Sequence, residues 1–425
     1  MDNLANRIEK YFDRLWGICR SITGPGFRQS LDILSEIVPF KLLEFKTGEK
    51  VLDWKIPKEW IPIDAYIIGP DKKKICEFKK NNLHLVGYSV PFKGKIKLSE
   101  LKKHLHTIPD KPDAIPYVTS YYKDYWGLCI SYDEFLKLKD GDYKVNVDTK
   151  FKKGKLVVAE AELKGKSKKE ILFSSYLCHP SLANNELSGP LVLSFLYEKL
   201  SQIKNRKFTY RFVLIPETIG SIALLSKKGK HFKENLIAGY QLTCIGDKGK
   251  FTYKKSRDGN TLTDKAAISV LEKKDFNLID FNPAIGSDER QYCSPGFNLP
   301  VGSLMRTMYT LYPEYHTSLD NKSIMDFNGM VESIDVLESI VCELEKYEIF
   351  LNKFPNGEPQ LGKRGLFRSL SEISRVEDEL AMWWILNYAD GKNDITSIAK
   401  RSGCNIETIK RVTNKLKEGG ILEKI

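Results

Sequence analysis

Several long apolar runs in the second half of the chain are each followed by a residue that can bind a metal ion or move a proton. His179 follows the run ILFSSYLC, Glu217 follows RFVLIP, Asp247 follows YQLTCIG, and His316 comes shortly after LPVGSLMR. Such runs are typical of buried strands, and ligand sites in open α/β sheets form at the carboxyl ends of those strands. The sequence therefore predicts a sheet that gathers these four side chains at one edge.

Composition and hydropathy describe an ordinary soluble globular protein. The chain has 425 residues, more than one compact core usually holds, so two or three domains are expected. No apolar stretch approaches the roughly 18 residues needed to cross a bilayer. The amphipathic start, MDNLANRIEKYFDRLWGIC, lacks the basic and apolar segments of a secretory signal. A cytoplasmic location without a membrane partner is therefore expected.

Charge and cysteine usage narrow the range of partners. The net charge is +12, but the lysines are spread along the chain and form no basic stripe interleaved with aromatic residues. A nucleic-acid partner is therefore not expected. The eight cysteines show no regular spacing, so disulfides are not expected either. Cys178, next to His179, is the one thiol placed to approach a metal ion.

The chain divides into segments with different patterns. Strand patterns alternating with amphipathic helices over 189–203, 222–232 and 331–352 predict a mixed sheet flanked by helices. Short aromatic-rich strands between Pro, Gly and Lys turns predict a separate β-rich unit. The predicted domains are an α/β core of residues 1–48 and 146–353, an inserted small β-rich domain of residues 49–145, and a C-terminal winged helix-turn-helix of residues 366–425.

The C-terminal module carries the helix-turn-helix pattern. DITSIAKRSG and IETIKRVTNKLKEGG predict its two characteristic helices, and GGILEKI predicts the start of a wing. DNA reading is one interpretation. The second helix, however, mixes acidic residues with its lysines, unlike a strongly basic recognition helix. A role in packing, in homo-oligomer formation or in binding a protein partner is therefore expected.

Three of the candidate residues have more than one interpretation. A carboxylate after a fully apolar strand is costly to bury without a partner, which favours Glu217 as a general base beside a metal-bound water. The alternative is a cap on the following helix. Asp247 is either a metal ligand or a turn residue between glycines. Asn185 and Glu186 lie within reach of the same site, Asn185 as a candidate metal ligand and Glu186 as a candidate substrate-binding residue, although asparagines at such positions also suit a turn.

Two later loops supply candidates for substrate binding and for support of a ligand. In GSDERQYCSPG, Asp288 is placed to bind an α-amino group, and Arg290 is placed to bind a carboxylate. Arg306, at the end of the next apolar run, is an alternative for the carboxylate. In YHTSLDN, Asp320 is placed to orient the imidazole of His316 as a carboxylate behind the ligand.

Several long motifs resemble one known family. The stretches CHPSLANNELSG, PETIGS, GSDERQYCSPG and YHTSLDN are similar, in their order, to the site motifs of the M28-type zinc aminopeptidases. Nearly the whole chain resembles the bacterial and archaeal aminopeptidase-like proteins associated with polysaccharide biosynthesis loci. That resemblance implies a zinc-exopeptidase-like core, an inserted small domain and a C-terminal winged helix.

The resemblance also implies roles for individual residues. His179, Asp247 and His316 would bind zinc, and Glu217 would act as the general base. A metal-dependent hydrolase of the aminopeptidase type follows, which cleaves an amide bond in a peptide or in an amino-acyl small molecule. Two alternatives stay open: an amidohydrolase or deacylase that acts on a polysaccharide precursor, and a binding or regulatory protein with a degenerate site.

The sequence departs from the family pattern at three positions. Asn185 stands where the family has a bridging aspartate, and Thr218 stands where it has the second glutamate of a pair. Ser181 replaces the usual acid two residues after the first histidine. Because ligand number and charge set metal affinity, one zinc ion is expected and not two. Asn185 would be a weak neutral ligand, and a rearranged site would recruit Glu186.

Overall fold

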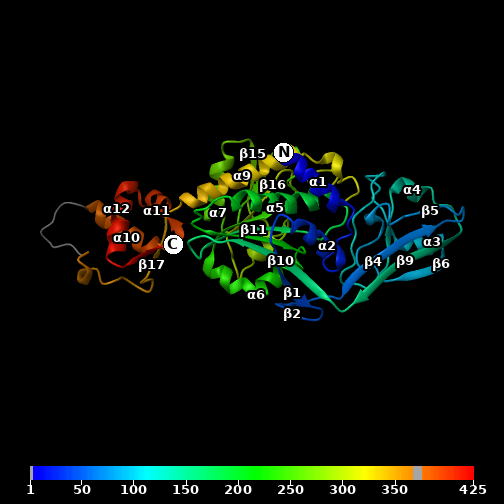
Figure 1. Cartoon of the computed structure of the whole chain (residues 1–425), viewed down its shortest axis with the longest axis horizontal. Helices are drawn as coiled ribbons and strands as arrows, with labels where there is room; N and C mark the ends of the chain where they lie inside the picture. Colours follow the sequence, from blue (N-terminus) through cyan, green and yellow to red (C-terminus); the bar gives the residue numbers. More distant parts are fainter. Residues whose placement is uncertain (1–2, 367–375) are drawn as a thin grey trace.

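The computed structural model describes residues 3–366 and 376–425 and shows three parts along the chain (Figure 1). The largest part is an eight-stranded mixed sheet of order β1-β10-β12-β11-β13-β16-β14-β15. Four neighbouring strands, β12, β11, β13 and β16, are parallel, and β10 and β14 run antiparallel to them. The strands are β1 (Lys41–Lys46), β10 (Lys155–Leu163), β11 (Glu170–Tyr176), β12 (Thr209–Ile215), β13 (Leu236–Leu242), β14 (Phe251–Lys254), β15 (Phe276–Ile279) and β16 (Val301–Met305).

Helices cover both faces of this sheet (Figure 1). They are α1 (Leu4–Trp16), α2 (Pro25–Leu34), α5 (Ser188–Ser201), α7 (Leu262–Leu271) and α9 (Phe327–Lys346) on one face and α6 (Ile219–Asn235) on the other. Along β10, Val157 and Ala159 belong to the core under the first group, whereas Leu156 and Val158 belong to the core on the α6 side. A strand buried on both faces requires this alternation. The predicted mixed sheet flanked by helices is confirmed, and no helix in the described ranges is long and apolar enough to span a membrane.

The inserted unit contains a four-stranded antiparallel sheet of order β5-β4-β9-β6. Its elements are β2 (Lys50–Val51), β3 (Trp54–Lys55), β4 (Glu59–Ile68), β5 (Lys74–Ile75), β6 (Phe92–Lys97), α3 (Leu98–Leu101), β7 (Leu105–His106), β8 (Leu128–Cys129), α4 (Tyr132–Leu136) and β9 (Asp142–Lys152). The chain leaves the large sheet after β1 and returns to it in β10, where Lys46 pairs with Lys155. Because β9 continues to Lys152, the boundary predicted at residue 145 falls inside this strand.

The C-terminal part is a winged helix (Figure 1). It consists of β17 (Ile349–Asn352), α10 (Val376–Tyr388), β18 (Asp390–Asp394), α11 (Ile395–Ser402), α12 (Ile406–Glu418) and β19 (Leu422–Lys424), with sheet order β18-β17-β19. β17 lies before residue 353, within the range predicted for the core, but it pairs with β18 and β19. Lys265 Nζ, on α7 of the core, donates to Ser397 Oγ of α11 at 2.7 Å.

Candidate active site

The parallel strands β11 and β12 end side by side and place His179 next to Glu217. β11 ends at Tyr176 and β12 at Ile215, and His179 Nε2 lies 3.5 Å from Glu217 Oε2. The two loops that follow are joined, because the Glu217 N–H donates to Cys178 Sγ at 3.2 Å. The structure thus brings two of the predicted site residues together at the carboxyl edge of the sheet.

His316 reaches the same place from the loop between β16 and α9. The ring centroids of His179 and His316 are 5.7 Å apart. At the roughly 2 Å zinc–nitrogen distance, one ion can bind two imidazoles with this separation. The ring of Tyr117, from the inserted unit, makes edge contacts with both imidazoles, at centroid distances of 5.0 and 5.2 Å. We refer to His179, Glu186, Glu217 and His316 as the carboxyl-edge site.

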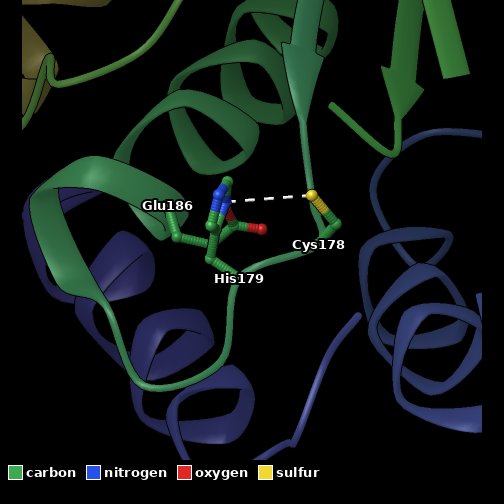
Figure 2. Close-up of side chains that lie close together, drawn as sticks. All are labelled: Cys178, His179 and Glu186. Atoms are coloured by element: carbon green, nitrogen blue, oxygen red, sulfur yellow. Dashed lines mark hydrogen bonds and ion pairs between the residues drawn. The ribbon is translucent and has the colours of Figure 1, made fainter. Parts of the chain in front are cut away.

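A buried ion pair lies behind His179. Figure 2 shows Glu186 beside the imidazole, and His179 Nδ1 lies 2.5 Å from Glu186 Oε2. Arg20 is fully buried, with its Nε 3.9 Å from Glu186 Oε1, and it donates to the His179 carbonyl at 3.0 Å. A carboxylate behind an imidazole fixes the orientation and tautomer of the ring. Glu186 is fully buried, so it is placed to orient His179, not to bind substrate as predicted.

The two imidazoles differ in charge. Burial opposes protonation of His179, but the contact of its Nδ1 with the Glu186 carboxylate outweighs burial, and the pKa of His179 lies well above its usual range. Burial raises the pKa of the Cys178 thiol to about 11, so this thiol is neutral near pH 7. Burial and the charge on His179 lower the pKa of His316 to about 3. His316 therefore has the neutral form that binds metals, whereas an ion at His179 must displace a proton.

Asp320 organises the loop that carries Asn185. This loop is a single π-helical turn over residues 183–187. The Asp320 carboxylate accepts the N–H groups of three successive residues, 183–185, at distances of 2.7 to 3.2 Å. The sequence predicted that Asp320 orients His316, but its carboxylate holds this turn instead. Asp320 supports the site through the backbone and not through the imidazole.

Asp247 lies beyond the end of β13, but its carboxylate faces structural partners. Its Oδ2 accepts a hydrogen bond from Asn184 Nδ2 at 3.1 Å, and its Oδ1 accepts the N–H groups of Gly249 and Thr307 at 2.8 and 3.3 Å. The bond to Gly249, two residues further on, is the turn interaction that the sequence offered as the alternative. The geometry therefore favours the turn residue over the metal ligand.

The backbone after Glu217 is strained, and Asp288 holds it. Thr218 has φ +62° and ψ −69°, and the Ile219 N–H donates to the Glu217 carbonyl at 2.7 Å, which is the rare, strained form of γ-turn. Asp288 Oδ1 accepts from the Thr218 N–H and from the Ser221 hydroxyl. Strain of this kind persists only where surrounding contacts enforce it, and it is common at active sites. Asp288 is fully buried, so it supports the turn and does not present the exposed acid that was predicted.

The two arginines predicted to bind a substrate carboxylate occupy different positions. Arg306 is only 5% exposed, and it donates to the carbonyls of Gly249 and Gly329 and to Ser333 Oγ at 2.8 to 3.2 Å. Its guanidinium therefore holds α9 to the end of β16. Arg290 is half-buried and donates through Nε to the Ser287 carbonyl at 3.3 Å. A substrate-binding role for Arg290 stays a prediction.

Sequence reasoning missed three residues of the site. Ser287 Oγ donates to Glu217 Oε1 at 2.7 Å and fixes that carboxylate. Arg20 was missed because no pattern marks a single charge whose partner lies far along the chain. Tyr117 did carry a signal, since it belongs to the aromatic-rich stretch AIPYVTSYY. An aromatic cluster in an inserted unit indicates a packing surface, but it does not reveal which site the surface covers.

A small cavity opens beside His179 and Glu217. It measures about 130 Å³, and Ile22, Tyr121 and Tyr122 contribute to its apolar lining. Cavities that enclose a whole small molecule usually measure roughly 300–1,000 Å³. The cavity therefore has room for only part of a substrate next to the two predicted catalytic groups.

Three ligand-type side chains gather most closely on the inner side of His179. In residues 3–366 and 376–425, Cys178, His179 and Glu186 are the only group of His, Cys, Asp or Glu whose ligand atoms all lie within 4.8 Å of one another (Figure 2). Cys178 Sγ is 3.8 Å from His179 Nδ1. The same Nδ1 faces Glu186, so an ion at this point would have to break the ion pair. The outward Nε2, which faces Glu217, is the better position for a metal ion.

The carboxyl-edge site offers two imidazoles, and Asn185 lies on the same turn as Glu186. Asn185 Nδ2 donates to the Tyr176 hydroxyl at 2.9 Å, and Asn185 Oδ1 is a buried acceptor without a partner among the described residues. Such orphaned acceptors call for a ligand that the protein chain does not supply, such as water or an ion. Two imidazoles and a neutral oxygen are donors that zinc accepts. Thr218 offers no carboxylate, so a second ion would lack its anionic ligand.

Three basic residues of α12 in the winged module pair with acids of the same module. Arg411 and Lys415, on α12, both contact Asp378 of α10, at 2.5 and 3.3 Å. Lys410 pairs with Glu407 at 2.8 Å on the same helix. A helix that reads DNA keeps its cations free for phosphates and bases. These cations of α12 are therefore engaged within the module, and the partner of the module stays a prediction.

The fold is similar to that of zinc aminopeptidases. A zinc aminopeptidase from Bacillus subtilis has a TM-score of 0.58 with this structure at 12% identity, covering 80% of this chain and 94% of that chain. At such low identity the similarity shows the shared fold alone. The family can be stated more closely from the sequence.

The chain belongs to the family described as a domain of unknown function (DUF4910), whose model matches residues 9–347. Residues 348–424 match a winged helix-turn-helix model. A protein of Clostridium acetobutylicum, whose name couples polysaccharide biosynthesis with an aminopeptidase-like domain, is 43% identical over 415 residues, 97% of this chain and 95% of that protein. A crystal structure from the same organism, named provisionally as a peptidase, has a TM-score of 0.79 at 41% identity and covers 99% of this chain and 96% of that chain. The chain therefore carries an aminopeptidase-like domain followed by a winged helix.

Proposed function

We propose that this protein is a metal-dependent hydrolase that cleaves an amide bond at the carboxyl-edge site. The observation that carries the proposal is the convergence of His179, Glu217 and His316. The two imidazoles are 5.7 Å apart, and the Glu217 carboxylate lies 3.5 Å from His179 Nε2. Two nitrogen ligands beside a positioned carboxylate are the parts that metal-assisted amide hydrolysis requires.

His179, His316 and Asn185 would hold the zinc ion. Such an ion supplies Lewis-acid polarisation of a carbonyl group and a lowered pKa for water when it is bound. Glu186 holds the His179 ring so that Nε2 points outward, and Asp320 holds the turn that carries Asn185. The site residues are therefore fixed by contacts that do not depend on substrate.

Glu217 would act as the general base and then as the general acid. Ser287 Oγ donates to Glu217 Oε1, so this oxygen is fixed and Oε2 faces His179 and the cavity. Glu217 would take a proton from the attacking water and deliver it to the nitrogen of the leaving amine. The strained turn at Thr218 sets the direction of this carboxylate, and Asp288 enforces the turn.

The Glu217→Gln variant tests this proposal most directly. The amide keeps the size and the Ser287 contact but cannot accept a proton, so hydrolysis of amide substrates should fall by about 10²–10⁴-fold. Wild type and variant should each contain close to one metal ion per chain, as measured by mass spectrometry. The matched control is Glu272→Gln on the exposed surface, which should keep full activity. A Glu217→Gln variant with undiminished activity would contradict the assignment of the base.

A second candidate function is ligand binding without catalysis. It is favoured by Thr218 and Asn185, which stand at two carboxylate positions of the family pattern, and by the hydrogen-bonded carboxylate of Asp247. Purified protein that holds less than about a tenth of an equivalent of any transition metal would support this candidate. The name of the Clostridium relative includes polysaccharide biosynthesis. Precursors of polysaccharides are therefore reasonable substrates or ligands to test for the two candidate functions.

A further inference from the structure

The inserted unit forms a wall over the carboxyl-edge site. We define the tyrosine wall as Tyr117, Tyr121 and Tyr122. Tyr117 contacts both imidazoles through its ring edge, and its hydroxyl lies 3.3 Å from the Tyr121 hydroxyl. Tyr121 and Tyr122 line the cavity beside Glu217, Tyr121 from a half-buried position and Tyr122 from its exposed rim. The wall therefore stands where the acyl part of an amide substrate would have to lie.

The wall is fixed to the core by backbone hydrogen bonds. The Tyr117 N–H donates to the His316 carbonyl at 2.9 Å, and the Ser318 N–H donates to the Ile115 carbonyl at 2.9 Å. The Ile115 N–H donates in turn to Ser318 Oγ at 2.9 Å. Because the same loop carries His316, the wall cannot withdraw without moving that imidazole. The size of the cavity beside the wall is therefore fixed by the same contacts that position His316.

That space is small and apolar on the side of the wall. The cavity of about 130 Å³ is lined there by Ile22, Ile219, Tyr121 and Tyr122. Its volume is well under the roughly 300 Å³ at which pockets begin to enclose whole small molecules. A short acyl group fits such a space, whereas a leucyl or an aromatic aminoacyl group does not.

The charges around the cavity point in the same direction. An N-terminal amino acid brings an α-ammonium group, which needs a free carboxylate. Glu217 is the only acid among the residues that line the cavity, and it is already proposed as the base. Glu186 and Asp288 are fully buried and engaged with His179 and with the Thr218 turn. A charged amine would therefore find no free carboxylate in the site, because the only acid at the cavity is the proposed base.

We propose that the protein is a deacylase for amides with a short, neutral acyl group, of about formyl to propionyl size, and that Tyr121, with Tyr122 at the exposed rim of the cavity, sets this limit. The inference rests on the proposed amide hydrolysis. Water adds to the acyl carbon, the C–N bond breaks, and the proton passes through Glu217 to the leaving nitrogen. The products are a short carboxylic acid and a free amine, and no redox partner is needed. The amine side of the substrate extends out of the cavity into solvent.

A matched substrate series tests the acyl limit. Zinc-loaded protein is given formyl, acetyl, glycyl and leucyl amides of one aromatic amine, and kcat/KM is measured for each. The acetyl amide should be cleaved at least tenfold faster than the glycyl amide, which is similar in size but charged, and than the leucyl amide. Each methylene misfit in a pocket is worth about 10-fold or more. Faster cleavage of the leucyl amide would overturn the acyl limit but leave amide hydrolysis standing.

Wall variants and a binding measurement complete the test. Tyr121→Ala with Tyr122→Ala should raise the ratio of leucyl to acetyl cleavage at least tenfold, whereas Tyr132→Ala, in the same unit but away from the cavity, should leave it unchanged. An unchanged ratio in the folded double variant would overturn the role of the wall. Saturation-transfer NMR on metal-free protein should detect the acetyl methyl group but not leucinamide. Hydrolysis of no amide would contradict the proposed function, and equal binding of both ligands would contradict the acyl limit separately.

Discussion

The carboxyl-edge site and the α10–α12 face of the winged module both gather charged side chains, but they satisfy them in different ways. In the winged module, Arg411 and Lys415 sit at the surface and share Asp378. At the carboxyl-edge site, Glu186 and Arg20 are fully buried, and Glu186 Oε1 and Arg20 Nη2 have no hydrogen-bond partner among the described residues. One region pairs its charges in water, and the other keeps buried charges incompletely paired.

This difference indicates where the folded protein keeps polar groups that lower its free energy of unfolding. Four of the nine buried polar atoms without a partner in the described residues belong to Arg20, Asn185, Glu186 and Asp288, whereas Thr413 Oγ1 is the one in the winged module. Buried groups of this kind cost stability unless a ligand, an ion or water completes them. Such atoms are therefore more frequent around the carboxyl-edge site than in the described part of the winged module. Three substitutions, in order of expected effect, test this comparison.

Arg20→Met should cause the largest loss of stability. It removes the arginine from the buried group formed with Glu186 and His179 and leaves only the imidazole beside the carboxylate, and breaking a buried charge pair lowers the free energy of unfolding by about 3–5 kcal/mol. Urea denaturation followed by tryptophan fluorescence measures the change. The control is Arg7→Met, which breaks the more exposed pair with Glu198. If both variants lose the same free energy of unfolding, burial of the Arg20–Glu186 pair does not make it more important to stability than the exposed pair.

Asp288→Asn should change how stability depends on pH. Burial and the nearby Glu217 carboxylate raise the pKa of Asp288 to about 8. The folded protein then holds a proton that the unfolded chain releases near pH 4, so wild-type stability falls as the pH rises from about 4 to about 8, by at most about 1.4 kcal/mol per pH unit, and levels off above that. Asparagine cannot ionise and still accepts from Thr218 and Ser221. Thermal unfolding between pH 6 and 9 should therefore show a flatter profile, and an unchanged slope would refute the raised pKa.

Arg411→Met should have the smallest effect. The Arg411 guanidinium lies at the surface, where ion pairs contribute little to stability and are screened by salt. The melting temperature should match that of wild type within error, both at low salt and at 0.5 M salt. A clear loss of stability would show that the α10–α12 face is more than a solvated surface. The comparison between the two regions would then fail.

The strand-end pattern was sufficient to place three of the four side chains that opened the sequence argument. His179 and Glu217 each directly follow a mostly apolar run, and His316 comes shortly after another; parallel neighbouring strands bring the ends of such runs together. Asp247 follows the same pattern, yet its carboxylate binds Gly249 and Thr307. A short aspartate between glycines satisfies the local backbone first, and this local preference competes with any long-range role.

The remaining site contacts depend on packing that a single sequence does not encode as a pattern. Arg306 was assigned to substrate because it ends an apolar run, but its partners include Gly329 on α9, which only the folded chain brings near. Asp320 was assigned to His316 by closeness in sequence, but it binds the 183–187 turn. The general fold follows from periodicity over long segments. Individual hydrogen bonds follow from loop geometry, which periodicity does not describe.

The pairing of Lys46 with Lys155 has a consequence for the history of the protein. The chain departs from β1 and rejoins β10 at neighbouring positions, so the whole inserted unit is topologically an enlarged hairpin connection. A lineage could gain or lose it in one genetic event without shifting the register of the strands that hold His179 and Glu217. Substrate choice and catalytic chemistry could then evolve on separate segments of one gene.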